Sequence, residues 1–258
     1  MDRALWTSTT GMQGQQRVTE NIANNLANVN TTGYKRGSVQ FQDLLYQSVS
    51  SAGASTAQGE TPVGIEIGSG TRVVGIVKNF TQGSMKDTGI SSNLGIQGDG
   101  FFEVTLPDGT KAYTRDGSFH KDSTGKFVTA NGYEVTSIPA IESEATSFDI
   151  REDGTVSSTV AGVSSNKGRV TLARFPNPGG LKPIGGNLYV ETTASGTPIS
   201  ANASESGNGL ILQNNRESSN VQVVREMVDM IAAQRAYEII SKSIKTSDEM
   251  LRNVTNLK

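Results

Sequence analysis

The chain has 258 residues and a formal net charge of -2, with 34% hydrophobic, 6% aromatic and 19% charged residues. A near-neutral chain with no basic run lacks the cationic face of nucleic-acid-binding proteins, so we expect no nucleic-acid partner. The absence of cysteine excludes disulfides, thiolate chemistry and zinc–sulfur sites. The apolar content is low for a compact enzyme but too high for general disorder. It therefore predicts a modest core plus segments that cannot bury themselves alone.

The first 32 residues predict a helix. They contain no proline, and an apolar stripe recurs at steps of three, four and seven residues. Two glycines inside the stretch, Gly11 and Gly14, lower its helix propensity, and Gly33 is the expected stop. The stripe includes Leu5, Met12, Ile22 and Leu26.

Residues 33–70 predict a connecting loop or extended segment, because 47–70 is rich in serine, glycine and alanine. Residues 71–215 predict a β-rich domain. Asp-Gly and Asn-Gly pairs punctuate this stretch at spacings that hairpins require, as at Asp116-Gly117 and Asp153-Gly154. Short strands with such regular turns favour an antiparallel sandwich or barrel.

Residues 216–258 predict a second long helix, since neither glycine nor proline occurs between Ser218 and Leu257. The predicted fold class is α+β. The long N- and C-terminal helices pair as a coiled coil, and the residues between them form a mostly antiparallel β domain. Pairing covers one side of each helix, so we expect other copies of the chain to cover the rest. The stripe of the second helix contains Val224, Val228, Ile231, Ile240, Ile244 and Leu251.

No pattern of residues predicts a catalytic, cofactor or metal site. His120 is the one histidine and no GxSxG motif accompanies it. The glycine-rich run 95–100 lacks a GK[ST] end and is typical of a tight turn. The aspartates do not have the spacing of an EF-hand. No stretch is long and apolar enough for membrane insertion, and no cleavable signal peptide is visible.

Four asparagines on the first helix recur at three- and four-residue steps: Asn21, Asn24, Asn25 and Asn28. Two interpretations remain open. Their side chains could hydrogen-bond across the helix packing and fix its register, as a buried asparagine does in coiled coils. Alternatively, they could be solvated or face a channel.

Several blocks of this sequence resemble the flagellar rod and hook protein family. The run IANNLANVNTTGYKR at 22–36 is similar to the signature of that family, and FQDLLYQ at 41–47 is typical of its distal-rod members. Further matches are GDGFFEV at 98–104, LPDGTKAYTRDGSF at 106–119, GNLYVET at 186–192 and the helix at 218–251. The signature residues carried over to this chain are Asn24, Asn25, Leu26, Asn28, Gly33, Tyr34 and Lys35.

The resemblance implies a structural subunit, not an enzyme, that polymerises helically into the distal rod of the flagellar basal body. Such a rod transmits torque to the hook and encloses the export channel. The implied partners are other copies, proximal rod proteins, the hook protein, the peptidoglycan and outer-membrane ring proteins and the flagellar export apparatus. The implied location is the periplasm-spanning rod, reached without a cleaved signal peptide. The alternatives are a proximal rod or hook subunit, or a rod-associated cell-wall hydrolase.

Overall fold

A computed structural model of the chain describes residues 2–50, 55–56, 59–60 and 63–256. The chain divides into two compact units. Unit 1 comprises Met1–Leu26, Gly37–Val77 and Val223–Lys258, and unit 2 comprises Ala27–Arg36 and Lys78–Gln222. The chain therefore passes between the units four times, and each unit is assembled from segments far apart in sequence.

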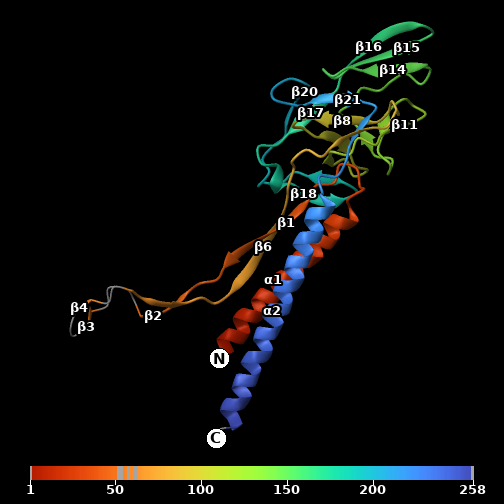
Figure 1. The fold of residues 1–258 in the computed structure, drawn as a ribbon. Helices are drawn as coiled ribbons and strands as arrows, with labels where there is room; N and C mark the ends of the chain where they lie inside the picture. Colours follow the sequence, from red (N-terminus) through yellow and green to blue (C-terminus); the bar gives the residue numbers. More distant parts are fainter. Residues whose placement is uncertain (1, 51–54, 57–58, 61–62, 257–258) are drawn as a thin grey trace. The chain divides into compact units, whose positions relative to one another are not determined.

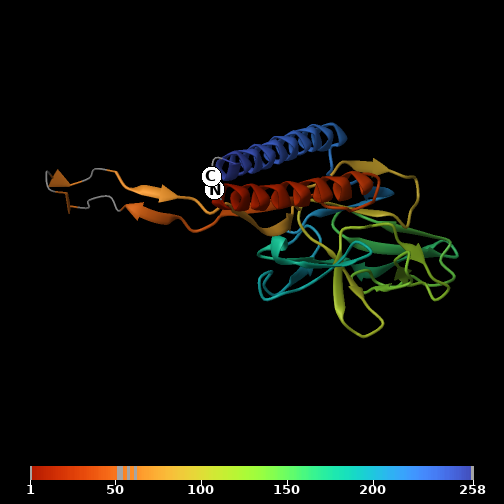
Figure 2. The same cartoon turned by 90° about the horizontal axis from the view of Figure 1, so that it is seen from below.

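Unit 1 contains both long helices and an extended ribbon of strands. In Figures 1 and 2, α1 and α2 lie side by side. Its elements are α1 (Asp2–Ala27), β1 (Gly37–Asp43), β2 (Gln47–Ser50), β3 (Ser55–Thr56), β4 (Gly59–Glu60), β5 (Ile65–Ile67), β6 (Thr71–Lys78) and α2 (Val223–Asn256).

Helix α1 runs unbroken through both of its inner glycines. A Cβ atom built on Gly14 would lie 2.6 Å from the Phe41 ring of β1, so the missing side chain makes room for that ring. The helix ends at Ala27, earlier than the predicted boundary at 32, and the chain then turns, with the Thr31 N–H donating to the Asn28 carbonyl. Helix α2 likewise begins at Val223 instead of 216, because Asn215–Glu217 forms strand β22 in unit 2.

The stretch 33–70, predicted as a connecting loop or extended segment, contains paired strands. Strands β1 and β6 form a two-stranded sheet, and β2 pairs antiparallel with β5 further along the same ribbon. Residues 71–77 belong to this ribbon in unit 1 and not to the β domain. The serine- and glycine-rich composition of 47–70 concealed the strands, and residues 51–54, 57–58 and 61–62 of that stretch lie outside the described part.

Unit 2 is built from short strands that pair antiparallel in its described part, as predicted. The largest sheet has seven strands in the order β11-β12-β13-β9-β10-β19-β18. The strands are β7 (Met85–Asp87), β8 (Leu94–Gln97), β9 (Phe102–Thr105), β10 (Lys111–Thr114), β11 (His120–Lys121), β12 (Phe127–Val128), β13 (Glu134–Val135), β14 (Ser147–Ile150), β15 (Thr155–Val160), β16 (Val163–Arg169), β17 (Thr171–Arg174), β18 (Lys182–Gly185), β19 (Leu188–Val190), β20 (Ile199–Asn202), β21 (Leu210–Gln213) and β22 (Asn215–Glu217).

The turn signals read from the sequence close these strands. The carboxylate of Asp108 accepts from both the N–H and the hydroxyl of Thr110, and Asp153 does the same for Thr155. These are Asx turns, in which an aspartate side chain substitutes for a backbone partner. Between the turns, strand residues alternate, so that Phe102 and Val104 of β9 enter an apolar core.

Within the described ranges, no helix has a stretch apolar enough to cross a membrane.

Candidate assembly surfaces

Asn25 is the polar centre of unit 1. Its side chain is 0% exposed, and its amide both donates to the Gly37 carbonyl at 3.0 Å and accepts from the Gly37 N–H at 2.9 Å. The same amide donates to the Glu226 carboxylate of α2 at 3.1 Å. One side chain therefore ties α1 to the start of β1 and to the first turn of α2.

The backbone of Gly37 is the common hydrogen-bond partner of two asparagines on α1. Asn21 also donates to its carbonyl, at 2.8 Å. A Cβ atom built on Gly37 would lie 2.5 Å from the Asn21 Oδ1 atom and 3.2 Å from Ile76. Close approach of two amide side chains to this backbone therefore requires glycine.

The other two asparagines of the predicted amide face have different surroundings. Asn24 is exposed, whereas Asn28 is half-buried and its Oδ1 atom accepts from the Thr31 hydroxyl at 3.1 Å. The amide face is thus divided: Asn21 and Asn25 fix the packing of unit 1, Asn24 lies at the surface, and Asn28 shapes the turn after α1.

Unit 2 holds a buried ion cluster around Lys35, which lies near the end of the signature run 22–36. The Lys35 ammonium donates to the Glu217 carboxylate at 2.6 Å and to the Thr81 carbonyl at 2.9 Å. Arg115 approaches the same carboxylate at 3.5 Å, and all three side chains are almost fully buried. Burial lowers the pKa of Lys35; the Glu217 carboxylate opposes this shift, and the Arg115 guanidinium adds to it.

Gly33 and Tyr34 complete this part of unit 2. Gly33 has a φ of +66°, and its N–H donates to the Glu217 carbonyl at 2.8 Å. A Cβ atom there would lie 2.7 Å from the Asp116 backbone nitrogen, so conformation and space both select glycine. The Lys78 ammonium sits 4.3 Å from the centre of the Tyr34 ring, a cation–π contact.

Asn220 joins three distant segments of unit 2. Its Oδ1 atom accepts from the Arg36 N–H at 2.8 Å, and its Nδ2 atom donates to the carbonyls of Asn79 and Thr81 at 2.9 and 3.0 Å. Arg36, Asn79 and Asn220 each lie within three residues of a point where the chain passes into unit 1. This side chain therefore fixes, within unit 2, the segments that continue into unit 1.

The apolar stripe predicted on the second helix occupies two opposite faces of α2. Ile240, Ile244 and Leu251 are half-buried and share a face with the buried Ala233 and Glu226. This inner face has a heptad repeat. Its two series of positions are 226, 233, 240 and 247, and 230, 237, 244 and 251. On α1, Ile22 is buried, and Leu5, Met12 and Leu26 are half-buried.

Val224, Val228 and Ile231 lie on the outer face of α2, where they are 76%, 60% and 54% exposed. At 3.6 residues per turn, these positions and Met227 form one apolar patch over the first turns of the helix. We call Val224, Met227, Val228 and Ile231 the outer patch. Further along the same face, Arg235, Glu238 and Lys242 are charged and exposed.

Exposed apolar side chains are concentrated in unit 1. Among the described residues, large exposed hydrophobics of unit 2 are few: Ile90, Val163, Ile184 and Ile199. Those of unit 1 lie on α1, on the outer patch and further along α2, and on both sides of the ribbon. The ribbon residues are Phe41, Leu45, Tyr46, Val49, Val63, Ile65, Ile67, Val74, Ile76 and Val77.

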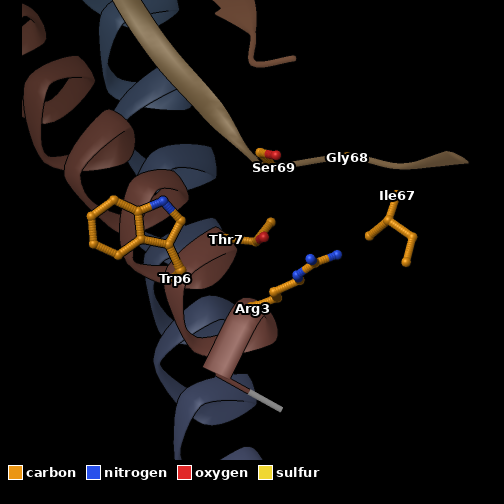
Figure 3. A pocket seen from close by; sticks show the side chains of 6 residues that line it. All are labelled: Arg3, Trp6, Thr7, Ile67, Gly68 and Ser69. Carbon is orange, nitrogen blue, oxygen red and sulfur yellow. The ribbon is translucent and has the colours of Figure 1, made fainter. Parts of the chain in front are cut away.

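The start of α1 and the segment before β6 enclose an open hollow of about 330 Å³. Figure 3 shows Arg3 pointing toward Ile67, while the indole of Trp6, which also lines the hollow, points away from both. Trp6 is 65% exposed. An exposed tryptophan beside an apolar hollow is typical of a protein–protein contact surface.

The residues considered for chemistry are not assembled into a reaction centre. His120 lies exposed on β11, and the glycine-rich run forms the end of β8 and the turn after it. The two fully buried acids, Glu217 and Glu226, are held by structural partners. Among the described residues, no group of three or more histidines or acids has the arrangement of a metal site.

The sequence did not predict the structural roles of five residues: Gly37, Arg115, Glu217, Asn220 and Glu226. Lys35 and Glu217 are 182 positions apart, and Asn25 and Glu226 are 201 apart. A buried lysine requires a carboxylate, but one sequence gives no sign of which of its acids supplies it. Paired substitutions in related sequences would be the signal.

Three family models match the chain. The model for flagella basal body rod protein matches residues 5–35, the flagellar hook protein FlgE/F/G D1 domain matches 95–158, and the flagellar basal body rod FlgEFG protein C-terminal model matches 212–257. The first match includes Asn25 and Lys35, and the last includes Glu217 and the whole of α2.

Curated relatives extend the similarity to the full length. The chain is 45% identical over 267 residues to flagellar basal-body rod protein FlgG of Borreliella burgdorferi, covering 100% of this chain and 99% of the relative. Identity is 44% to FlgG of Buchnera aphidicola subsp. Acyrthosiphon pisum, covering 98% and 99%, and 38% to FlgG of Bacillus subtilis, covering 100% of both. The chain belongs to the family of flagellar basal-body rod proteins and is a structural subunit of the distal rod, not an enzyme.

Proposed function

We propose that the chain builds the rod by helical self-assembly through the apolar surfaces of unit 1, with the outer patch of α2 packing against other copies. The observation that carries this proposal is that patch. Four large apolar side chains on one helix face are exposed in the single chain, although the opposite face of the same helix has a partner in α1. Contacts between unlike surfaces of identical subunits generate an open helical filament.

The pairing of α1 and α2 as a coiled coil is part of the same proposal. Its support is the heptad repeat on the inner face of α2 and the hydrogen bond between Asn25 and Glu226. A Cβ atom on Gly11 of α1 would lie 3.5 Å from the Ile240 side chain, so these two positions already face each other.

The partners of the assembled rod follow from this role. We expect proximal rod proteins and the hook protein at its two ends, ring proteins of the peptidoglycan layer and outer membrane around it, and the flagellar export apparatus as its route of delivery without a cleaved signal peptide. The names of the relatives support the basal-body rod location and specify none of these partners. They stay predictions.

The proposal is tested by Ile231→Asp in motile cells. Ile231 is exposed in the single chain, so we expect the purified variant to unfold at the wild-type temperature while rod assembly and swimming are lost, because a charge is buried between copies. Ser243→Asp, an exposed position elsewhere on α2, is the matched control and should leave swimming intact. Normal swimming of Ile231→Asp would refute the role of the outer patch.

A further inference from the structure

A second hollow lies wholly within unit 2 and is separate from the apolar surfaces of unit 1. Its volume is about 250 Å³. This volume is below the usual range of small-molecule sites, so the hollow has room for one or two side chains. Its lining is aromatic and proline-rich but includes two arginines and one acid: Phe80, Asp99, Gly100, Phe101, Arg115, Arg174, Phe175, Pro176 and Pro178.

The apolar walls of this hollow are held in place by packing among themselves. Phe101 makes edge-to-face contacts with Phe80 and Phe175, with ring centres 5.4 and 5.8 Å apart. Phe101 and Phe175 are buried, and the carbonyl and N–H of Phe101 both pair with Ala173. The hollow is therefore a preformed feature of unit 2.

Arg115 forms part of the lining with unused hydrogen-bonding capacity. It is 4% exposed, its guanidinium stacks 5.3 Å from the Phe101 ring centre, and one terminal nitrogen donates to the Gly98 carbonyl at 2.8 Å. The other terminal nitrogen is 3.5 Å from Glu217, and the Nε atom has no hydrogen-bond partner among the described residues. A buried donor without a partner is unfavourable and uncommon.

The ion cluster behind this lining carries more positive than negative charge. Lys35 and Arg115 share the single carboxylate of Glu217, and one oxygen of that carboxylate is already engaged by Lys35 at 2.6 Å and by the Gly83 N–H at 2.8 Å. Asp99, in the lining of the hollow, is a second carboxylate whose charge acts on Arg115. These two cations and two carboxylates balance one another, so any further cation in the lining leaves an excess of positive charge.

Arg174 supplies a second cation to the hollow. It is half-buried, and within the described part of the chain no ion pair or side-chain hydrogen bond engages its guanidinium. Asp99, the one acid in the lining, is exposed to water. With Arg174 included, the hollow and its ion cluster hold three cations against two carboxylates. The remaining positive charge makes the hollow complementary to an anion, and its aromatic and proline walls favour an anion with an apolar body.

From this we infer that the hollow is a docking site for an acidic peptide segment of a partner protein, in which a glutamate or aspartate side chain binds Arg174 and Arg115 beside an apolar side chain that packs on Phe80 and Phe175. Guanidinium–carboxylate pairing provides the charge-assisted hydrogen bonds. This inference concerns unit 2 alone and does not depend on how unit 1 assembles.

The test is a titration of the ¹⁵N-labelled full chain, followed by NMR through the arginine Nε–Hε signals, which single Arg→Lys variants assign. The probes are the dipeptides acetyl-Phe-Glu-amide and acetyl-Phe-Gln-amide, with inorganic phosphate as a third titrant. We expect saturable shifts of the Arg115 and Arg174 signals with the glutamate peptide, and a dissociation constant roughly tenfold or more below that of the glutamine peptide.

Two variants sharpen the test. Arg174→Gln, a substitution at a half-buried side chain, should weaken glutamate-peptide binding about tenfold or more while the remaining spectrum stays unchanged. Asp99→Asn should tighten binding because it removes the repelling carboxylate. Equal affinity for the two peptides, wild-type affinity in Arg174→Gln, or tighter binding of phosphate than of the glutamate peptide would each overturn the inference.

Discussion

At Asn25, one amide group links three segments of unit 1 that lie far apart in the sequence. The four-asparagine pattern alone left two interpretations open, and the structure gives a different answer for each position. Asn25 is buried and bonded to Gly37 and Glu226, whereas Asn24, its neighbour in the chain, is exposed. A helical face explains this, because adjacent positions point about 100° apart.

Asn25 and Gln13, an exposed residue of the same helix, make a matched pair for measurement. We expect Asn25→Ala to lower the free energy of unfolding of unit 1 by about 1–3 kcal/mol, because the Gly37 N–H and the Glu226 carboxylate lose a buried partner. Gln13→Ala should change it by roughly 0.5 kcal/mol or less. Circular dichroism at 222 nm during thermal unfolding reports this difference, since both long helices belong to unit 1. Equal effects of the two substitutions would contradict the assigned role of Asn25.

Glu217 is the residue whose loss should damage unit 2 most. Glu217→Ala leaves the buried ammonium of Lys35 and the guanidinium of Arg115 without their shared carboxylate, and we expect a loss of about 3–5 kcal/mol. The control is Glu144→Ala, at an exposed side chain, which should be close to neutral. Urea unfolding followed by near-ultraviolet circular dichroism of the tyrosines measures both. A loss below roughly 1 kcal/mol for Glu217→Ala would show that the cluster is not stabilising.

The buried phenol of Tyr189 should make the stability of unit 2 fall at alkaline pH. Burial raises the pKa of this buried phenol to about 12, with Tyr34 and Glu217 adding to the shift. Between pH 10 and 12 the folded state therefore keeps a proton that the unfolded state releases, so stability falls as pH rises through this window. The decrease from this residue is on the order of 2–3 kcal/mol.

Urea unfolding at pH 9.5 and 11.5 tests the prediction. In Tyr189→Phe the decrease between these two pH values should be smaller than in the wild type. Tyr46→Phe, at an exposed side chain of the ribbon in unit 1, should leave the decrease unchanged. An unaltered pH dependence in Tyr189→Phe would disprove the link to this phenol.

At the scale of elements, long periodic segments were predictable and their partners were not. Both helices follow from apolar spacing and from the lack of proline, and the turns of unit 2 follow from Asp-Gly pairs whose aspartates close Asx turns. For residues 33–70 the sequence predicted a loop or extended segment but not the pairing of its strands, because the serines and glycines of 47–70 hide the alternation of apolar residues. The apolar residues of α2 predict a single stripe, but Ile231 and Ile240 lie on opposite sides of the helix.

The two inner glycines of α1 have different neighbours, which gives an element-scale prediction. Gly11→Ala places its methyl group at an ordinary 3.5 Å from Ile240, so we expect the gain in helix propensity, up to about 1 kcal/mol, to appear as stability. Gly14→Ala should gain less or lose stability, because its methyl group meets the Phe41 ring at 2.6 Å. Thermal unfolding at 222 nm ranks the two, and a larger gain for Gly14→Ala would contradict the packing of β1 on α1.

At the scale of the whole molecule, the two units differ in how they use apolar residues. Unit 2 buries them in two core clusters, whereas unit 1 leaves many of them exposed along its helices and ribbon. Low overall hydrophobicity predicted a modest core together with segments that need partners, and this division matches it. The sequence could not indicate which terminal-helix residues face the partner helix, since that depends on packing between segments about 200 positions apart.

The central claim is that the outer patch of α2 contacts other copies of the chain. The most direct measurement places a photo-activated residue at Val228, which is 60% exposed in the single chain, and irradiates intact motile cells. We predict a ladder of products at multiples of the 27.3 kDa subunit mass on a denaturing gel, strongest when rods are assembled. Unmodified monomer alone, or a single adduct with an unrelated protein, would contradict self-assembly through this surface.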